Sequence, residues 1–313
     1  MVSYASDVKK ELTSLPVHPE HAKAELAAFL RMNGVLSLRD RQFSLDITTE
    51  NPAIARRIFS LIKTAYDIEP LLIVSKKMKL KKNYQYLVRL KKNVYEILED
   101  LDVFNKEKGF ITGIPDKIMN SDQRAMSYLR GAFLAAGSVN NPETSRYHLE
   151  IYSLYQNHND ELAELMNKYF YLNAKKTKRR NGYIVYLKEA EKIGDFLHIV
   201  GAVNAMLSFE DLRIMRDMRN SVNRLVNCDT ANLKKTANAA AKQVEDIQLI
   251  ESNIGLDDLP EKLSILARFR LENPELSLKE VAARVPDGPL SKSGVNHRFH
   301  KIHEFAEKIR NNE

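Results

Sequence analysis

The stretch Leu26-Ala-Ala-Phe-Leu-Arg-Met-Asn-Gly34 decides the fold, because a second version of it occurs as Leu129-Arg-Gly-Ala-Phe-Leu-Ala-Ala-Gly137. Both copies are rich in small residues and space their large apolar residues as a helix does. Each ends at a glycine, and Gly34 can adopt the left-handed conformation that closes a helix. The two copies begin 103 positions apart, at Leu26 and Leu129. A period of this length is too long for a solenoid unit, so it predicts a duplicated half-domain.

The same order of elements follows each copy. An alternating strand comes first, then a helix, and then a basic hairpin. The matching strands are Phe43-x-Leu45-Asp46-Ile47 with Tyr147-x-Leu149-Glu150-Ile151, and Tyr86-Leu-Val-x-Leu-Lys91 with Tyr183-Ile-Val-x-Leu-Lys188. We therefore expect an α+β domain with pseudo-twofold symmetry over residues 1–206, its halves lying at about 19–110 and 121–202.

The strand pattern ends after Leu207, and residues 207–255 predict a helical connector. Residues 256–313 predict three short helices. Ser277-Leu-Lys-Glu280 has the form of a capping box, and Ser291 is placed to cap the last helix. This spacing favours an all-α helix-turn-helix domain, although the turn from Val285 to Leu290 is long for that motif.

The composition favours an anionic partner. The chain has 313 residues and a net charge of +7, with a pI near 9.2, which is moderately basic. Its single cysteine, Cys228, excludes an internal disulfide and fits a reducing compartment. We find no signal peptide and no apolar run that could span a membrane, so we expect a cytoplasmic, nucleoid-associated protein.

Residues 20–205 resemble the LAGLIDADG homing-endonuclease fold, in which the two motif helices pack side by side. Small residues would let the two backbones approach closely, and they stand at Ala27, Ala28, Gly131, Ala132 and Ala135. The resemblance also implies a pair of carboxylates, one residue before each final glycine. In the family these hold divalent metal at the scissile phosphates.

Those two positions are Asn33 and Ala136, and an earlier acidic position of the motif is occupied by Arg31 and Leu134. Hard divalent cations need several oxygen ligands. Asp40 and Glu143 lie in the loops that follow, and nothing in the pattern places them at the helix ends. We therefore expect no catalytic residue, no metal, no cofactor and no enzyme activity, with a residual metal-dependent endonuclease as the weakest alternative.

The two hairpins carry a bias toward cations that recurs in both halves, which favours contact with DNA phosphates. The alternative is a solvated hairpin that lysine keeps soluble. The candidate residues are Lys76, Lys77, Lys79, Lys81 and Lys82 in the first hairpin, and Lys176, Lys178, Arg179 and Arg180 in the second.

The terminal helix has one apolar face, formed by Val295, Phe299, Ile302 and Ala306, and the stretch from Gly288 to His303 contains no acidic residue. Short polar and basic residues on the other face suit entry into a major groove; the alternative is an ordinary helix with a polar outside. Three histidines on this helix lack the cysteine or carboxylate that would complete a zinc site. The candidate DNA-binding residues are Ser291, Lys292, Ser293, Asn296, His297, Arg298, His300 and Lys301.

Two segments, Pro289–Arg298 and Arg224–Thr236, resemble the WhiA family of bacterial transcription regulators. The resemblance covers essentially the whole chain. It implies a degenerate LAGLIDADG domain joined to a helix-turn-helix, promoter DNA as the double-stranded partner, and regulation of sporulation or cell-division genes.

A protein-interaction scaffold in cell division or chromosome segregation, with incidental DNA affinity, stays open as an alternative. So do other transcription or cell-division proteins as partners. The oligomeric state is undetermined, and we favour a monomer because we find no apolar heptad and expect no exposed apolar stripe.

Overall fold

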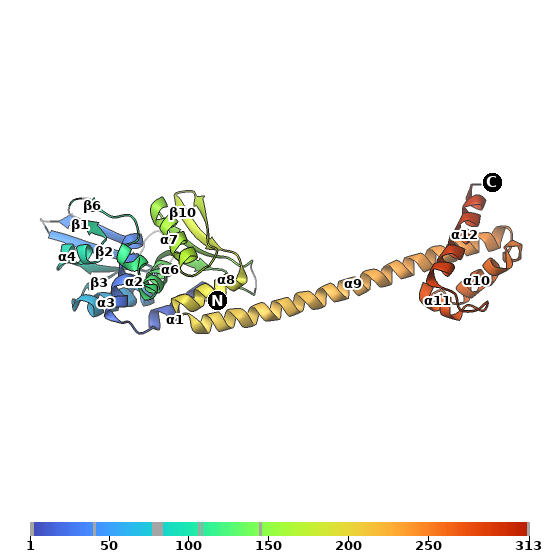
Figure 1. Cartoon of the computed structure of the whole chain (residues 1–313), viewed down its shortest axis with the longest axis horizontal. Coiled ribbons are helices and arrows are strands. Elements are labelled where there is room, and N and C mark those ends of the chain that lie inside the picture. The colour runs from blue at the N-terminus through green and yellow to red at the C-terminus, as the bar shows by residue number, and fades with distance from the viewer. Residues whose placement is uncertain are drawn as a thin grey trace. The chain divides into compact units, whose positions relative to one another are not determined.

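The computed structural model describes residues 3–39, 42–76, 84–105, 107, 109–143 and 146–311. The chain divides into two compact units, a first unit of residues 1–216 and a second unit of residues 217–313. Figure 1 shows both, and each is described by itself below. In the described part of the chain, no helix is long and apolar enough to cross a membrane.

The first unit contains the duplication that the repeat predicts. The first half comprises α1 (Tyr4–Ser14), α2 (Pro19–Asn33), β1 (Gly34–Arg39), β2 (Gln42–Thr49), α3 (Pro52–Tyr66), β3 (Leu71–Lys76), β4 (Tyr84–Leu90) and α4 (Val94–Asp100). The second half comprises α6 (Asp122–Ala136), β7 (Gly137–Val139), β8 (Leu149–Ser153), α7 (Gln156–Lys168), β9 (Lys175–Arg179), β10 (Gly182–Leu187) and α8 (Ala190–Val200). Short elements β5 (Phe104–Asn105), β6 (Gly109–Phe110) and α5 (Asp116–Met119) join them.

The two sheets have the same antiparallel strand order, which confirms the predicted α+β duplication. One sheet runs β1-β2-β4-β3 and the other β7-β8-β10-β9. In Figure 1 the sheet of the first half, in blue to cyan, lies on one side of the helix pair α2 and α6, and the sheet of the second half, in green to yellow, lies on the other.

Close approach of α2 and α6 explains the small residues of the motif. A Cβ added at Gly131 would lie 2.5 Å from the backbone oxygen of Glu25, so no side chain fits there. The left-handed conformation predicted for Gly34 is wrong: its φ is −78°, and the φ of Gly137 is −84°. Each helix runs directly into a strand, and a Cβ at either glycine would collide with the preceding helical turn.

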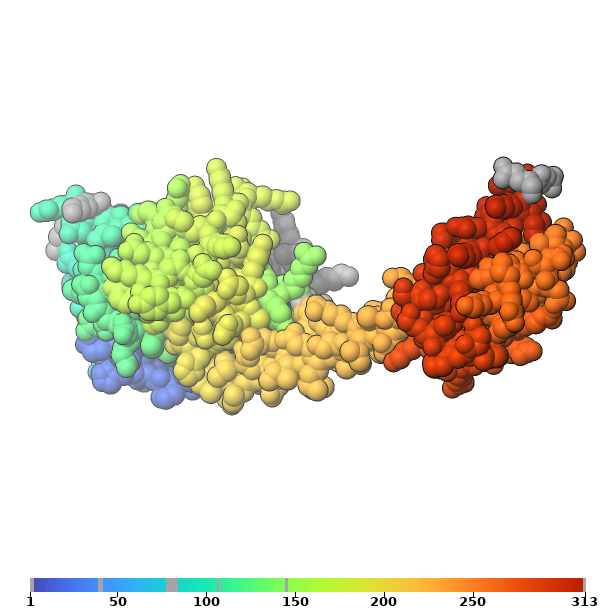
Figure 2. Space-filling model, turned by 45° about the vertical axis from the view of Figure 1, so that its right-hand side comes forward, coloured from blue at the N-terminus to red at the C-terminus, as the bar shows by residue number. Residues whose placement is uncertain are grey.

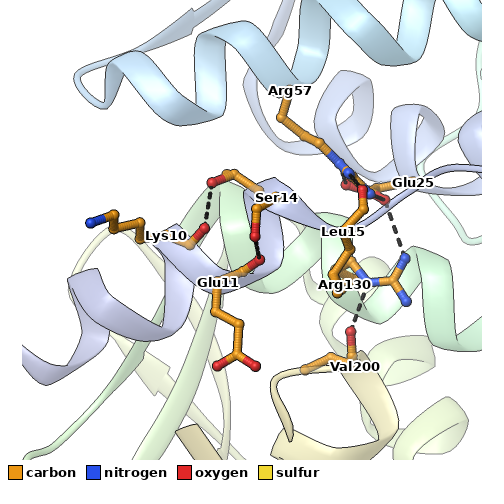
Figure 3. Close-up of polar contacts among 9 residues, drawn as sticks. Lys10, Glu11, Ser14, Leu15, Glu25, Arg57, Arg130 and Val200 are labelled. Atoms are coloured by element: carbon orange, nitrogen blue, oxygen red, sulfur yellow. Dashed lines mark hydrogen bonds and ion pairs between the residues drawn. The ribbon is translucent and has the colours of Figure 1, made fainter. Parts of the chain in front are cut away.

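A buried ion cluster joins the two halves next to this contact (Figure 3). Glu25 of α2 is 0% exposed and accepts two hydrogen bonds of 2.9 Å from Arg57 of α3. Arg130 of α6 lies 3.4 Å from the same carboxylate and donates to the carbonyl oxygen of Val200 at 2.7 Å. Arg57 also donates to the carbonyl oxygen of Leu15. One carboxylate therefore holds three helices together.

The second unit is helical, as predicted. It contains the later part of α9 (Val203–Asn253), the 3-10 turn η1 (Leu256–Asp258), α10 (Glu261–Glu272), α11 (Leu278–Arg284) and α12 (Lys292–Arg310). The predicted apolar face of α12 is buried, and it packs with Ile247 and Ile250 of α9 in one core. The capping box at Ser277 and Glu280 is present, and the Ser291 hydroxyl accepts from Gly294 N at 3.0 Å.

One expectation fails on α9. A stripe of exposed apolar side chains runs along this helix, whereas we expected no exposed apolar stripe. Within the second unit its members are Met218, Val222, Leu225, Val226 and Leu233, each more than half exposed. This removes one of the two arguments for a monomer.

Candidate nucleic-acid interface

The ends of α2 and α6 are where the resembled nucleases hold metal. Asn33 donates from Nδ2 to the carbonyl oxygen of Thr48 at 3.4 Å, and Ala136 has no ligand atom. Glu143 is exposed in the loop after β7, and Asp40 lies outside the described residues. No group of three histidine, cysteine or acidic residues among the described residues could hold a metal ion. The two positions before the terminal glycines thus offer one amide and no carboxylate.

A buried polar chain in the second half was not predicted. His158 is 0% exposed; its Nε2 lies 2.8 Å from the Tyr128 hydroxyl and its Nδ1 lies 2.9 Å from the Ser153 hydroxyl. Burial, assisted by the positive charge of Arg31, lowers the pKa of His158 to about 3. The side chains of Tyr128, Ser153 and His158 are all buried. This serine–histidine contact therefore faces no substrate and has a structural role. Tyr128 lies 30 residues before His158, so no local sequence pattern joins these two members.

The first hairpin is described only in part. Lys76 is exposed at the end of β3, whereas Lys77, Lys79, Lys81 and Lys82 lie outside the described residues. On the face of this sheet opposite Leu45 and Ile47, Arg89 donates twice to Asp46 at 2.7 Å. That arginine therefore has its charge compensated within the sheet.

The cations of the second hairpin do not form one surface. Residues directly opposite in an antiparallel pair share a face. Lys176 and Lys178 lie opposite Val185 and Tyr183, on the face that packs against helices, and Lys176 lies 2.6 Å from Asp160 of α7. Arg179 points to the other face, 2.8 Å from Glu150. Arg180 is exposed in the turn. The sequence analysis treated the run of basic residues as one surface, although successive side chains of a strand point to opposite faces of the sheet.

Asp46 and Glu150 are equivalent residues of the two halves, and each has an arginine partner on the open face of its sheet. Glu150 also lies 2.9 Å from His148 Nε2. Sequence reasoning overlooked the pair, although the repeat contains the signal: an acidic residue stands between two buried residues in both matching strands. These pairs reduce the positive potential that phosphate contact requires.

The outward face of α12 agrees with the predicted arrangement of side chains. Lys292, Ser293, Asn296, His297, His300 and Lys301 are exposed. Ser291 is exposed as well, but its hydroxyl caps the helix. His300 lies 3.6 Å from Glu304, and His303 turns away to Asp246 of α9, at 2.7 Å. The histidines thus point to different partners.

Arg298 differs from the other candidates. Its guanidinium pairs with Asp287 in the turn and lies 3.5 Å from the carbonyl oxygen of Lys262, and its side chain is only 17% exposed. It therefore joins α12 to the turn and to the start of α10. As placed, it does not present its donors outward as a base-contacting residue must.

A cluster of cationic side chains lies beside the start of α12, and the sequence analysis did not predict it. A cavity of about 240 Å³ is lined by residues that include Lys235 of α9, Lys279 of α11 and Lys292 of α12. Arg270 also lines it and is 1% exposed, with a hydrogen bond of 2.7 Å to the carbonyl oxygen of Leu276. Burial lowers the pKa of Arg270. Three lysines from separate helices meet here without a carboxylate lining the cavity.

A duplicated LAGLIDADG-type unit followed by a helix-turn-helix defines the class of protein, and comparison with known proteins identifies the family. Family models match in three places: the WhiA N-terminal LAGLIDADG-like domain at residues 19–104, the WhiA LAGLIDADG-like domain at 125–219 and the WhiA C-terminal HTH domain at 222–306. The chain belongs to the WhiA family.

The similarity to relatives spans the full length. The chain is 86% identical over 310 residues to the "Probable cell division protein WhiA" of Lactobacillus gasseri, covering 99% of each sequence. It is 79% identical to the protein of the same description from Lactobacillus acidophilus, covering 99% of this chain and 100% of that one. The crystal structure of full-length DUF199/WhiA from Thermatoga maritima matches with a TM-score of 0.59 and 27% identity, covering 98% of both chains.

Proposed function

We propose that this protein is a non-enzymatic regulator of transcription that binds specific double-stranded DNA at promoters of cell-division and sporulation genes, in the cytoplasm and on the nucleoid. The observation that carries the proposal is the outward face of α12. Its polar and basic side chains are exposed over a buried apolar face, with no acidic residue from Gly288 to His303.

The helix-turn-helix supplies the specificity. With the N-terminal part of α12 in the major groove, Ser293, Asn296 and His297 reach base edges, because short amide and hydroxyl groups pair with the donors and acceptors exposed there. Lys292 and Lys301 contact phosphates. Arg298 acts through its pair with Asp287 as a positioning residue that fixes the angle of α12.

The first unit supports a role without cleavage. Metal-assisted phosphate transfer depends on carboxylates that hold the ion where charge develops, and Asn33 and Ala136 cannot form such a pair. The paired residues on the open sheet faces leave this unit as a less specific DNA surface or a platform for other proteins.

The test begins with the intact protein and random-sequence duplexes, from which a preferred site is selected. Fluorescence anisotropy then compares Asn296→Ala with Lys308→Ala, a control at an exposed position near the other end of α12. We expect Asn296→Ala to weaken binding to the selected site by about 1–3 kcal/mol and to leave nonspecific binding unchanged. Equal loss on both DNAs contradicts the proposed base contact.

Two further experiments address the alternatives. Supercoiled plasmid incubated with the protein and Mg²⁺ or Mn²⁺ should stay intact. Nicking that Asn33→Ala abolishes would support the endonuclease alternative. The exposed apolar stripe of α9 is the observation that favours a scaffold. Genome-wide crosslinking separates the two non-enzymatic functions, since a regulator gives sharp promoter peaks with a shared sequence and a scaffold gives scattered enrichment.

A further inference from the structure

The cavity beside the start of α12 contains a buried arginine that has no anionic partner. Arg270 lies near the end of α10, is 1% exposed and forms no ion pair among the described residues. By contrast, the buried Arg57 of the first unit pairs with Glu25 at 2.9 Å. Burial lowers the pKa of Arg270, and only the charge of the exposed Glu275 acts in the other direction. A buried cation without a counter-ion is costly, so Arg270 is a candidate for binding an anion.

The guanidinium of Arg270 also has hydrogen-bond donors that the protein leaves unused. Its Nη1 donates to the carbonyl oxygens of Leu276 at 2.7 Å and Asn273 at 3.3 Å. Its Nε is buried without a partner, and its Nη2 makes no hydrogen bond within the described part of the chain. The ring of Phe299 lies 5.2 Å from the guanidinium carbon and compensates the charge only weakly. An acceptor bound in the cavity would pair the unused donors.

The lining of the cavity supplies further cations. Lys235 of α9, Lys279 of α11 and Lys292 of α12 line it together with Arg270. None of these lysines forms an ion pair with any residue that the structure describes, and no carboxylate is among the described residues of the lining. Because the four cations come from four helices, they surround the space from different directions. This arrangement suits a ligand group with several anionic oxygens, such as phosphate.

A buried acceptor in the same lining narrows the class of ligand. Gln243 lines the cavity, and its Oε1 is buried with no hydrogen-bond partner in the described part of the chain. The ligand should therefore provide one donor in addition to its anionic acceptors. Hydrogen phosphate has both kinds of group, and so does a phosphomonoester of a molecule with hydroxyl groups. A simple carboxylate such as acetate has a single charge and no donor.

The size of the cavity favours a small ligand over DNA. Its volume of about 240 Å³ is below the roughly 300–1,000 Å³ of sites that hold drug-sized molecules. Since Arg270 is 1% exposed, a ligand must enter the cavity to pair its unused donors. A phosphate in the backbone of a duplex is joined to a sugar on both sides, so it stays outside such a cavity.

We propose that this cavity is a binding site for a small phosphate ligand, either inorganic phosphate or the phosphate group of a small phosphomonoester. The N–H groups of Arg270 that are now unpaired donate to the phosphate oxygens, and Lys235 and Lys279 neutralise the remaining charge. Lys292 is already proposed to contact DNA and is not required. This inference goes beyond the proposed DNA-binding function and does not depend on it.

Occupancy of the phosphate site would stabilise the position of α12. Figure 2 shows the side chains of α12, in red, against those of the preceding helices, in orange. Arg270 connects the site to this contact, because it lies over the ring of Phe299 on the buried face of α12. A ligand that binds only the folded state raises the temperature of unfolding. The second unit should therefore unfold at a higher temperature when the site is filled.

The test uses the full-length protein in phosphate-free buffer at constant ionic strength. Isothermal titration calorimetry measures the binding of inorganic phosphate and of glycerol phosphate, with acetate as the control anion. We expect saturable binding of a phosphate probe, none of acetate, and a Tm that rises with the concentration of the probe. Tighter binding of glycerol phosphate would identify an ester as the ligand, and tighter binding of inorganic phosphate would identify the free ion. Absence of saturable binding for both probes overturns the proposal.

Two pairs of lysines separate the phosphate site from general attraction by positive charge. Lys235→Ala/Lys279→Ala removes two cations of the lining, whereas the control Lys242→Ala/Lys308→Ala removes two exposed cations that do not line the cavity. We expect the first variant to raise the Kd for the phosphate probe about tenfold or more, and the control to leave it unchanged. Equal losses contradict the proposal.

Arg270→Met tests the buried donors directly. It keeps an unbranched apolar side chain but removes the guanidinium, so phosphate should no longer raise Tm. A variant that folds and retains the full rise in Tm overturns the role of Arg270. If the variant does not fold, the pair Lys235→Ala/Lys279→Ala decides the question, because both of its residues are exposed.

Competition with DNA distinguishes a small ligand from the phosphates of a duplex. Random-sequence duplex is titrated into protein that is saturated with the phosphate probe, and we expect the probe to stay bound. If the duplex displaces the probe and Lys235→Ala/Lys279→Ala weakens DNA binding as strongly as probe binding, the cavity accepts the DNA backbone and the proposal is wrong. Failure of the proposed function is a separate result, since Asn296→Ala tests DNA binding without changing the phosphate site.

Discussion

The guanidinium of Arg298 donates to the carboxylate of Asp287, and this pair joins the middle of α12 to the turn that precedes it. Both side chains are mostly buried. An arginine that seemed from its neighbours to face DNA therefore stabilises the position of α12, the helix proposed to bind DNA.

Arg298→Ala should lower the stability of the second unit by about 1–3 kcal/mol, because Asp287 keeps a mostly buried carboxylate without its partner. Thermal unfolding measures the change. Lys301→Ala is the control, since Lys301 is exposed on the same helix and should leave Tm unaltered. If Arg298→Ala unfolds at the normal temperature and loses only its discrimination between DNA sequences, the positioning role is wrong.

Glu25→Gln should destabilise the first unit by about 3–5 kcal/mol, because Arg57 and Arg130 would be left as buried charges without a carboxylate. Glu20 lies on the same helix and forms an exposed pair with Arg124 at 3.0 Å. Glu20→Gln should cost less than about 1 kcal/mol. Urea unfolding of both variants decides the point, and equal effects would mean that the cluster contributes no more than a surface pair.

His158 predicts a loss of stability in mild acid. Its pKa of about 3 lies below the ordinary 6.5, so between these values the unfolded state binds more protons than the folded state. The contribution is present above pH 6.5 and is lost as the pH falls toward 3, with a slope of up to about 1.4 kcal/mol per pH unit. Urea titrations between about pH 7 and pH 5 should show a shallower slope for His158→Asn. Parallel slopes would refute the prediction.

Gly131→Ala should disrupt the packing of α2 against α6. The added Cβ would meet the backbone oxygen of Glu25 at 2.5 Å, and backbone cannot move aside without separating the helices. Gly194→Ala in α8 is the matched control, because its Cβ would meet only the end of the Glu210 side chain, at 2.6 Å. We expect a loss of about 1–3 kcal/mol for Gly131→Ala and little change for the control, measured by thermal unfolding.

The topology of the first unit was predictable because it depends on the order of elements, and the repeat states that order twice. The buried face of α12 and both helix caps were predictable for a similar reason: they depend on residues three or four apart along the chain. What depends on contacts between distant residues was not. The contact of His158 with Tyr128, for example, joins residues 30 positions apart on different helices.

The candidate site was predicted unevenly. The outward side chains of α12 follow directly from helical spacing, so their exposure was expected correctly. The partner of Arg298 is Asp287, in an irregular turn whose path no periodicity describes. In the second hairpin, a run of lysines and arginines looked like one surface, but strand alternation sends Lys176 and Arg179 to opposite faces. The exposure of α9 was missed because apolar spacing does not show whether a partner covers it.

The two halves differ in sequence at the position of Glu25. By the alignment of the repeat, its counterpart in the second half is Tyr128, and the counterpart of Arg130 is Ala27. A homodimer assembled from two first halves would therefore bring two Glu25 carboxylates toward its axis with no Arg130 to receive either. Each Glu25 would keep Arg57 but would lack the second cation, so the contact between the halves depends on a difference between the two copies.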